Sequence, residues 1–164
     1  MATATPVTAE RLRRLADDGV LFAVVDACDR GDVPPRAWER GAPSLYAGTE
    51  DAALWAIAPY LFAVDGDLLD WIGERRNDAW GVFAVADCGL DALATHLRGL
   101  LVVRSPEGER WRFRFYDPRV LPAFLESCDD ETRRGFFGPA SAFGVWMAEE
   151  ARLFHATGIR LVER

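Results

Sequence analysis

The fold is decided by the stretch ERWRFRFYDPRVLPAFL, residues 109–125, because two structural periods meet inside it. From Arg110 to Phe115, cationic and aromatic side chains alternate strictly, which is the period-2 pattern of a β-strand with two unlike faces. The alternation predicts that Trp111, Phe113 and Phe115 face the core and that the arginines between them face the other way.

A helix is expected directly after this strand. Asp117 is a favourable N-cap residue and Pro118 suits the first helical position. Apolar residues then recur at helical spacing, namely Val120, Leu121, Phe124 and Leu125. We therefore expect the strand to end and the helix to begin at Asp117. We also expect Asp117 to pair with a nearby arginine, so that its loss costs about 1 kcal/mol or more.

Working outward, the chain alternates between predicted strands and helices. Continuous apolar runs predict buried strands over residues 20–27, 60–64 and 79–86. Helices are predicted over residues 8–17, 34–40, 49–56, 68–75 (with Asp67 as the cap) and 90–101, with a short one from 129. Hairpins are predicted to join residues 101–104 to 110–116 and 141–147 to 152–155. This order predicts an α/β or α+β fold, with helices flanking a mixed β-sheet and hairpins in the C-terminal half.

Size and charge limit the classes of protein. A chain of 164 residues suits one domain over residues 1–164, with a flexible start over residues 1–7. A net charge of −7 argues against a nucleic-acid or anionic-membrane partner. All 19 basic residues are arginines, and without lysine there is neither a P-loop nor a Schiff-base site. The start lacks a signal peptide and no apolar run approaches membrane-spanning length, so we expect a cytoplasmic protein.

Four predicted strands end at or beside an aspartate: Asp26, Asp65, Asp87 and Asp117. Carboxylates at the carboxyl ends of strands can converge on Mg²⁺ and handle phosphate. This pattern makes a Mg²⁺-dependent phosphohydrolase or phosphotransferase the alternative function. Each aspartate also suits a local role as a cap or turn residue.

The other side chains with catalytic potential form no recognisable set. Cys28, Cys88 and Cys128 are widely spaced and contain no Cys-x-x-Cys pair, which is typical of free thiols. The chain has two histidines and lacks the Gly-x-Ser-x-Gly motif of hydrolases. We therefore expect no catalytic residue, no metal site and no cofactor.

One row of arginines suggests binding rather than catalysis. Three from the 110–116 strand share a face with a fourth on the expected partner strand: Arg110, Arg112, Arg114 and Arg104. Guanidinium groups bind carboxylates through paired hydrogen bonds, so this face could hold an acidic partner surface. The alternative is a solvated outer face paired with Glu107 and Glu109.

The run FRFYDPRVL, residues 113–121, resembles the signature of the adaptor, or effector-loading chaperone, family of bacterial type VI secretion. That family was long catalogued only as a domain of unknown function. Further blocks agree in order, at residues 21–27, 58–61, 80–83, 93–104 and 136–139. The resemblance spans about residues 20–146.

The resemblance implies a non-enzymatic cytosolic protein, a Tap-type adaptor. Such a protein holds a toxic effector and joins it to the spike protein at the tip of the secretion needle. On this interpretation the candidate partner-binding residues are Arg104, Arg110, Arg112, Arg114 and Arg119. The candidate structural motif consists of Asp26, Asp117, Pro118 and Arg119.

Overall fold

The computed structural model describes residues 4–156 and contains a six-stranded sheet, a separate two-stranded hairpin and seven helical segments in that range. The six sheet strands are β1 (Ala4–Val7), β2 (Leu21–Asp26), β3 (Pro59–Ala63), β4 (Gly81–Ala86), β7 (Ala140–Met147) and β8 (Glu150–His155). Their order across the sheet is β1-β8-β7-β4-β2-β3. The hairpin consists of β5 (Val102–Arg104) and β6 (Arg110–Arg112).

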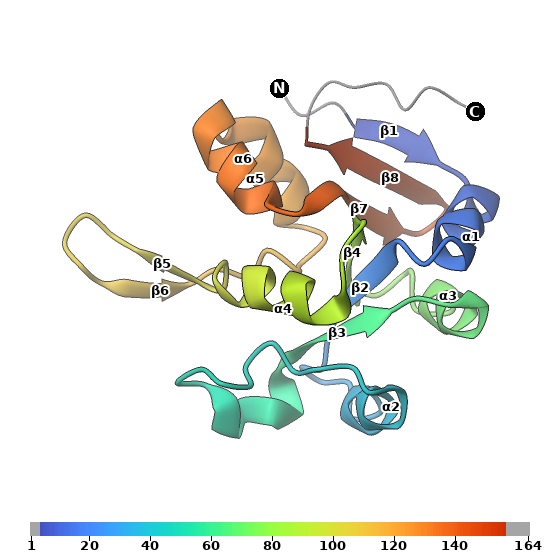
Figure 1. Cartoon of the computed structure of the whole chain (residues 1–164), viewed down its shortest axis with the longest axis horizontal. Helices are drawn as coiled ribbons and strands as arrows, with labels where there is room; N and C mark the ends of the chain where they lie inside the picture. Colours follow the sequence, from blue (N-terminus) through green and yellow to red (C-terminus); the bar gives the residue numbers. More distant parts are fainter. Residues whose placement is uncertain (1–3, 157–164) are drawn as a thin grey trace.

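Helices cover both faces of the sheet. They are α1 (Ala9–Asp17), α2 (Val33–Arg40), the 3₁₀ segment η1 (Ala52–Ile57), α3 (Gly66–Gly73), α4 (Leu90–Arg98), α5 (Leu121–Ser127) and α6 (Asp130–Phe137). In Figure 1, α1 and α3 lie on one side of the sheet and α4, α5 and α6 on the other, while α2 lies beyond β3. Within residues 4–156, no helix is long and apolar enough to cross a bilayer.

The expected fold class is confirmed, since helices flank a sheet and hairpins occupy the C-terminal half. The sheet itself is not mixed, because each neighbouring pair among its described strands is antiparallel. The connection from β2 to β3 leaves and re-enters the sheet at the same end, with Asp26 opposite Pro59, so the chain returns antiparallel. The long apolar run of β2 reflects helices on both faces rather than parallel pairing, and all six residues of β2 are buried.

Most predicted elements are present near their predicted bounds. The exceptions lie where a polar residue or an edge strand decides the local structure. Residues 4–7, expected to be flexible, form edge strand β1 and pair with Ala151–Phe154 of β8; residues 1–3 lie outside the described range. The cap of α3 is Asp65 rather than Asp67, because the Asp65 side chain accepts a hydrogen bond from the backbone N–H of Leu68.

The helix predicted to begin at Asp117 begins four residues later, at Leu121. The carbonyl of Asp117 accepts hydrogen bonds from the N–H groups of Val120 and Leu121, at 2.9 and 3.0 Å. Its carboxylate accepts one from the N–H of Arg119 at 2.9 Å. Asp117 therefore caps a single turn that leads into α5, and strand β6 ends earlier than predicted, at Arg112.

The aromatic row of the β6 stretch is buried only in part. Phe115 is fully buried, and Phe113 packs against Phe124 and Phe136 from α5 and α6. Trp111 was expected in the core, but 53% of it is exposed. The reason is that the β5–β6 hairpin extends away from the sheet and its helices (Figure 1), so nothing covers its outer face at this position.

Gly81 is required where β4 begins beside β2. Its φ of +154° is rarely adopted by side-chain-bearing residues, and a Cβ at this position would collide with the backbone carbonyl of Val24. We predict that Gly81→Ala lowers the free energy of unfolding by more than about 3 kcal/mol. Urea denaturation followed by circular dichroism measures this change.

Gly31→Ala is the matched control, because a Cβ at Gly31 meets nothing within 4 Å. Its expected effect is within about 0.5 kcal/mol of zero. Equal stability of the Gly81→Ala variant and the natural chain would contradict the described register of β2 and β4.

Candidate interaction surface

The β5–β6 hairpin places three arginines on one face. Arg104 lies directly opposite Arg110 in the antiparallel register, and Arg112 is two residues further along β6 on the same face. Arg114 follows just after the strand ends. We call these four residues, Arg104, Arg110, Arg112 and Arg114, the arginine row.

Two members of the arginine row, Arg110 and Arg112, contact acidic residues far away in the sequence. Arg112 donates to Asp51 at 2.6 Å, and Arg110 donates to the same carboxylate at 3.3 Å. Arg110 also lies 3.5 Å from Glu50. The alternative pairing with Glu107 and Glu109 is therefore not the one that these two arginines make. Their partners come from the segment before η1, which the sequence could not place opposite the hairpin.

Asp51 holds the hairpin to this segment as an ionised group. Desolvation raises its pKa, but the hydrogen bonds from Arg112 and Arg110 outweigh that effect, and the net pKa of Asp51 is below its usual value. The Asp51 carboxylate therefore stays charged at neutral pH and keeps the two guanidinium groups in place.

Arg114 makes a different contact, with a buried carboxylate at the end of β2. Its guanidinium donates to Asp26 at 2.6 Å, and the side chain of Asp26 is only 5% exposed. The N–H of Cys28 donates to the other carboxylate oxygen at 3.0 Å. Burial raises the pKa of Asp26, and the Cys28 N–H and Arg114 oppose that rise without cancelling it.

Asp117 and Arg119 form a closed pair beside it. The Nε and Nη2 atoms of Arg119 donate to the two oxygens of Asp117 at 2.9 and 2.8 Å. Asp117 and Pro118 are buried, while the Arg119 side chain is 66% exposed. Tyr116 is buried next to them, and desolvation together with the Tyr46 side chain raises its pKa. This motif fixes the corner between hairpin and helix.

The four strand-end aspartates do not converge on one point: Asp117 lies near enough to Asp26 for their charges to interact, but Asp65 and Asp87 do not join them. Asp26 lies at the same end of the sheet as Pro59, whereas β4 and β3 run the opposite way and carry Asp87 and Asp65 at the other end. Asp65 is occupied by the cap of α3 and by Arg40 at 2.9 Å. No group of three or more potential metal ligands occurs within residues 4–156. The geometry gives the magnesium hypothesis no support.

Sequence reasoning missed an apolar groove next to Asp51. Trp38 of α2 and Trp55 of η1 have ring centroids 5.4 Å apart, and they are 60% and 49% exposed. They border a groove of about 540 Å³. Its lining residues are Trp38, Ala42, Pro43, Ser44, Ala47, Gly48, Ala52, Trp55 and Tyr60. The only sequence signal was the presence of two tryptophans in short helices, because the periodicity of two turns cannot show which face is uncovered.

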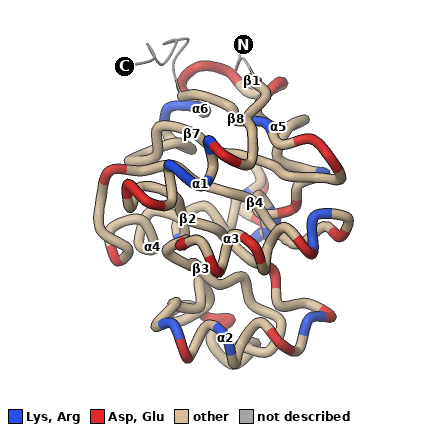
Figure 2. Tube along the Cα trace, turned by 90° about the vertical axis from the view of Figure 1, so that its right-hand side faces the viewer, with Lys and Arg blue, Asp and Glu red and all other residues tan. Residues whose placement is uncertain are grey.

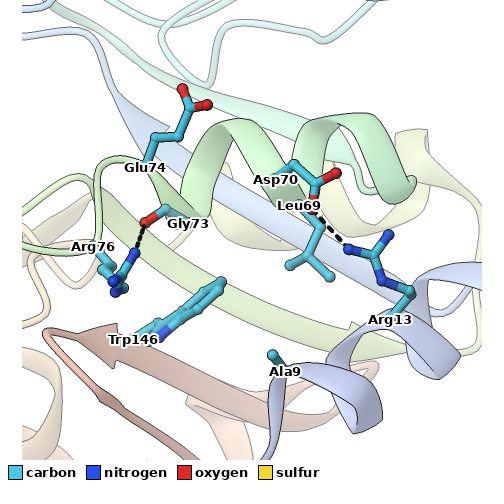
Figure 3. Close-up of a pocket in the computed structure, with 8 residues that line it drawn as sticks. All are labelled: Ala9, Arg13, Leu69, Asp70, Gly73, Glu74, Arg76 and Trp146. Carbon is cyan, nitrogen blue, oxygen red and sulfur yellow. Dashed lines mark hydrogen bonds and ion pairs between the residues drawn. The ribbon is translucent and has the colours of Figure 1, made fainter.

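A second hollow, of about 320 Å³, lies between α1, α3 and β7 (Figure 3). Its polar groups are already paired, with Arg13 on Asp70 at 2.7 Å and Arg76 on the Gly73 carbonyl at 2.7 Å. Trp146 packs so closely under Gly73 that a Cβ there would lie 3.1 Å from the indole ring. This hollow lies where α1, α3 and β7 pack against one another, and the polar groups named here are already hydrogen-bonded.

The side of the molecule away from the hairpin carries residues of both charges. Figure 2 shows acidic and basic residues interspersed along α1 and α2, whereas the charged residues of α3 are acidic. Arginine side chains there pair with nearby carboxylates, as Arg75 does with Asp32 at 2.7 Å. The hairpin differs from this side, because the charged residues on one face of its two strands are all arginines.

Fold and surface together define an α+β domain with exposed tryptophans and a basic hairpin, features typical of a protein-binding module. Comparison with protein families then gives the particular family. The model described as Domain of unknown function (DUF4123) matches residues 21–135, and the chain belongs to this family. The matched region includes the 113–121 run, while residues 136–146 of the resemblance lie beyond it. No curated protein and no solved structure matches the chain.

The Asp117–Arg119 pair gives a pH-dependent prediction. The hydrogen bonds from Arg119 lower the pKa of Asp117 against the opposing effect of desolvation. A carboxyl whose pKa is lowered by folding adds stability above its unfolded pKa of about 3.9, and that stability is lost as the pH falls through the folded pKa. We predict that Asp117→Asn costs roughly 1–2 kcal/mol at pH 7 and less at pH 3.

Urea unfolding of both proteins at the two pH values measures this difference. Asp87→Asn is the control, because Asp87 is exposed and has no ion pair with another residue of the described range. A cost for Asp117→Asn that is the same at pH 3 as at pH 7 would contradict the assigned role of the pair.

Proposed function

We propose that this protein is an adaptor of bacterial type VI secretion that binds a toxic effector and loads it onto the spike protein. On this proposal it acts in the cytoplasm, works by protein–protein binding without catalysis, and uses residues 1–164 as one adaptor-type domain. The observation that carries the proposal is the family match over residues 21–135, which contains the adaptor-like run FRFYDPRVL.

The exposed side chains support a binding role. Trp38, Trp55 and Trp111 each expose about half or more of their surface. Tryptophan and arginine are the residue types most enriched at the energetically important positions of protein interfaces. A protein of this size gains nothing for its own stability by exposing three indole rings, so their exposure is best explained by partners that cover them.

Within the proposed function, the five candidate arginines divide into two groups. Arg104, Arg110 and Arg112 lie on the projecting hairpin, where a partner can reach their guanidinium groups. Arg114 and Arg119 are tied to Asp26 and Asp117, so we assign them mainly to holding the corner.

Co-purification tests the proposal directly. The tagged chain is co-expressed with the toxin and the spike protein encoded by the neighbouring genes. We predict a stable complex with the toxin, and a ternary complex when the spike protein is added. The Trp111→Ser variant, altered at an exposed residue, is expected to fold normally and reports whether the outer hairpin face contributes.

The control is the same experiment with a toxin from an unrelated secretion cluster, which is expected not to bind. Failure of the chain to bind either neighbouring protein, while it remains folded by circular dichroism, would overturn the adaptor proposal.

A further inference from the structure

The Trp38–Trp55 groove and the arginine row are neighbours, because one short segment belongs to both. Ala47, Gly48 and Ala52 line the groove, and Asp51, immediately before Ala52, accepts the hydrogen bonds of Arg112 and Arg110. The guanidinium of Arg112 also lies 5.7 Å from the centroid of the Tyr46 ring, one residue before Ala47. An apolar groove therefore borders the hairpin part of the arginine row, Arg104, Arg110 and Arg112, which we call the basic edge.

The groove accepts apolar groups. Its lining is dominated by aromatic, alanine and proline side chains, and the hydroxyl of Tyr60 is already bonded to the Trp55 carbonyl at 2.8 Å. A volume of about 540 Å³ lies within the range of clefts that bind ligands. Because the polar groups inside are used internally, burial of apolar side chains is the main source of affinity that the groove can offer.

The basic edge has hydrogen-bond donors to spare. Each guanidinium carries five N–H donors, and Arg112 uses only its Nη2 atom to bind Asp51. Arg104 forms no ion pair with a residue of the described range, and the Arg112 side chain is 46% exposed. Carboxylates from a partner can therefore bind here while Asp51 stays in place and keeps the guanidinium groups oriented.

Charge decides which partner this surface suits. The chain as a whole carries a net charge of −7, which repels acidic partners at long range. At physiological ionic strength that repulsion is screened beyond about 8 Å, so nearby charges govern the docked state. Glu50 and Asp51 pair with Arg110 and Arg112 there, whereas Arg104 has no such partner among the described residues. A basic segment would place like charges against the row, which costs binding free energy.

We propose that this surface binds an acidic amphipathic segment of a partner protein. Large apolar side chains of the segment occupy the Trp38–Trp55 groove, and its Asp or Glu residues bind Arg104, Arg110 and Arg112. The inference deepens the proposed function and rests on it for the source of the segment, which is the effector that the adaptor holds. The chemistry of the segment follows from the groove and the row alone.

The test uses the full-length chain and a random 16-residue peptide library displayed on phage. We expect the enriched peptides to combine at least two large apolar residues with net negative charge. A labelled peptide made from the enriched set is expected to bind at least tenfold more weakly to the Trp38→Ser/Trp55→Ser variant. Both tryptophans are exposed, so this variant is expected to keep the melting temperature of the natural chain within a few degrees.

A charge reversal tests the basic edge. Arg104→Glu is expected to weaken the labelled peptide at least threefold at 50 mM salt and by less at 500 mM. Arg14→Glu makes the same change of charge on α1, on the other side of the sheet from the hairpin (Figure 1), and is expected to leave binding unchanged.

Four results would overturn the inference: no enriched peptide, enrichment of basic or uncharged peptides, binding that survives the double tryptophan substitution, or equal effects of Arg104→Glu and Arg14→Glu. A dimer in sedimentation that the double tryptophan substitution converts to a monomer would also overturn it, because a second copy would then occupy the groove. If peptides bind as expected but the neighbouring toxin and spike protein do not, the adaptor function fails while this surface assignment stands.

Discussion

An ion pair between the buried carboxylate of Asp26 and the guanidinium of Arg114 ties the β5–β6 hairpin to the central sheet. It joins the end of β2, deep in the sheet, to the corner after β6, 88 residues away along the chain. The Asp26 carboxylate is almost fully buried and its pKa is raised by that burial, so it needs a cationic partner at this position. A pair of this kind adds little net stability, because desolvation offsets the attraction, but breaking it by removing the cation is costly. Its effect is to fix where the hairpin leaves the body of the protein.

The position of the hairpin then determines the surface. With Arg114 held at Asp26, the preceding residues of β6 run outward, and Arg112 and Arg110 reach Asp51. On the inner side, Phe113 and Phe115 enter the aromatic cluster with Phe124 and Phe136. The same alternating sequence thus supplies core residues near the corner and a basic edge further out. The adaptor function that we propose uses the outer part and leaves the corner as its support.

Much of this architecture is predictable, because short sequence patterns determine where many of its strands and helices form. The buried strands 20–27 and 79–86 and the helix after Asp129 follow from apolar runs and an N-cap, and the structure has β2, β4 and α6 there. The helix start at Asp117 was predicted four residues early, because Arg119 competes for the Asp117 side chain and a separate turn forms first. The edge strand β1 was missed because its pairing with β8 depends on residues about 150 positions away.

The sequence predicts that the candidate site contains a face of arginines, but it does not predict which residues surround that face. The alternation in residues 110–115 indicates an arginine face, yet nothing local shows that Asp51 and Asp26 are its partners. The sequence does not predict the Trp38–Trp55 groove, because its walls come from α2, the 42–48 segment and η1, which lie together only in the folded chain. The alternation wrongly predicts a core position for Trp111, because it shows which residues share a face but not whether that face is covered.

A double-mutant cycle on Asp26 and Arg114, followed by urea unfolding at pH 7, tests whether this ion pair holds the hairpin to the sheet. Arg114→Gln is expected to cost about 1–3 kcal/mol, because it leaves the nearly buried Asp26 carboxylate without its cation, whereas Asp26→Asn is expected to cost less. Adding Asp26→Asn to Arg114→Gln should then restore stability, with a coupling of at least about 1 kcal/mol. The exposed pair Arg13–Asp70 provides the comparison, with an expected coupling below about 1 kcal/mol. If the effects of Asp26→Asn and Arg114→Gln simply add, within about 0.5 kcal/mol, the ion pair does not hold the hairpin in place.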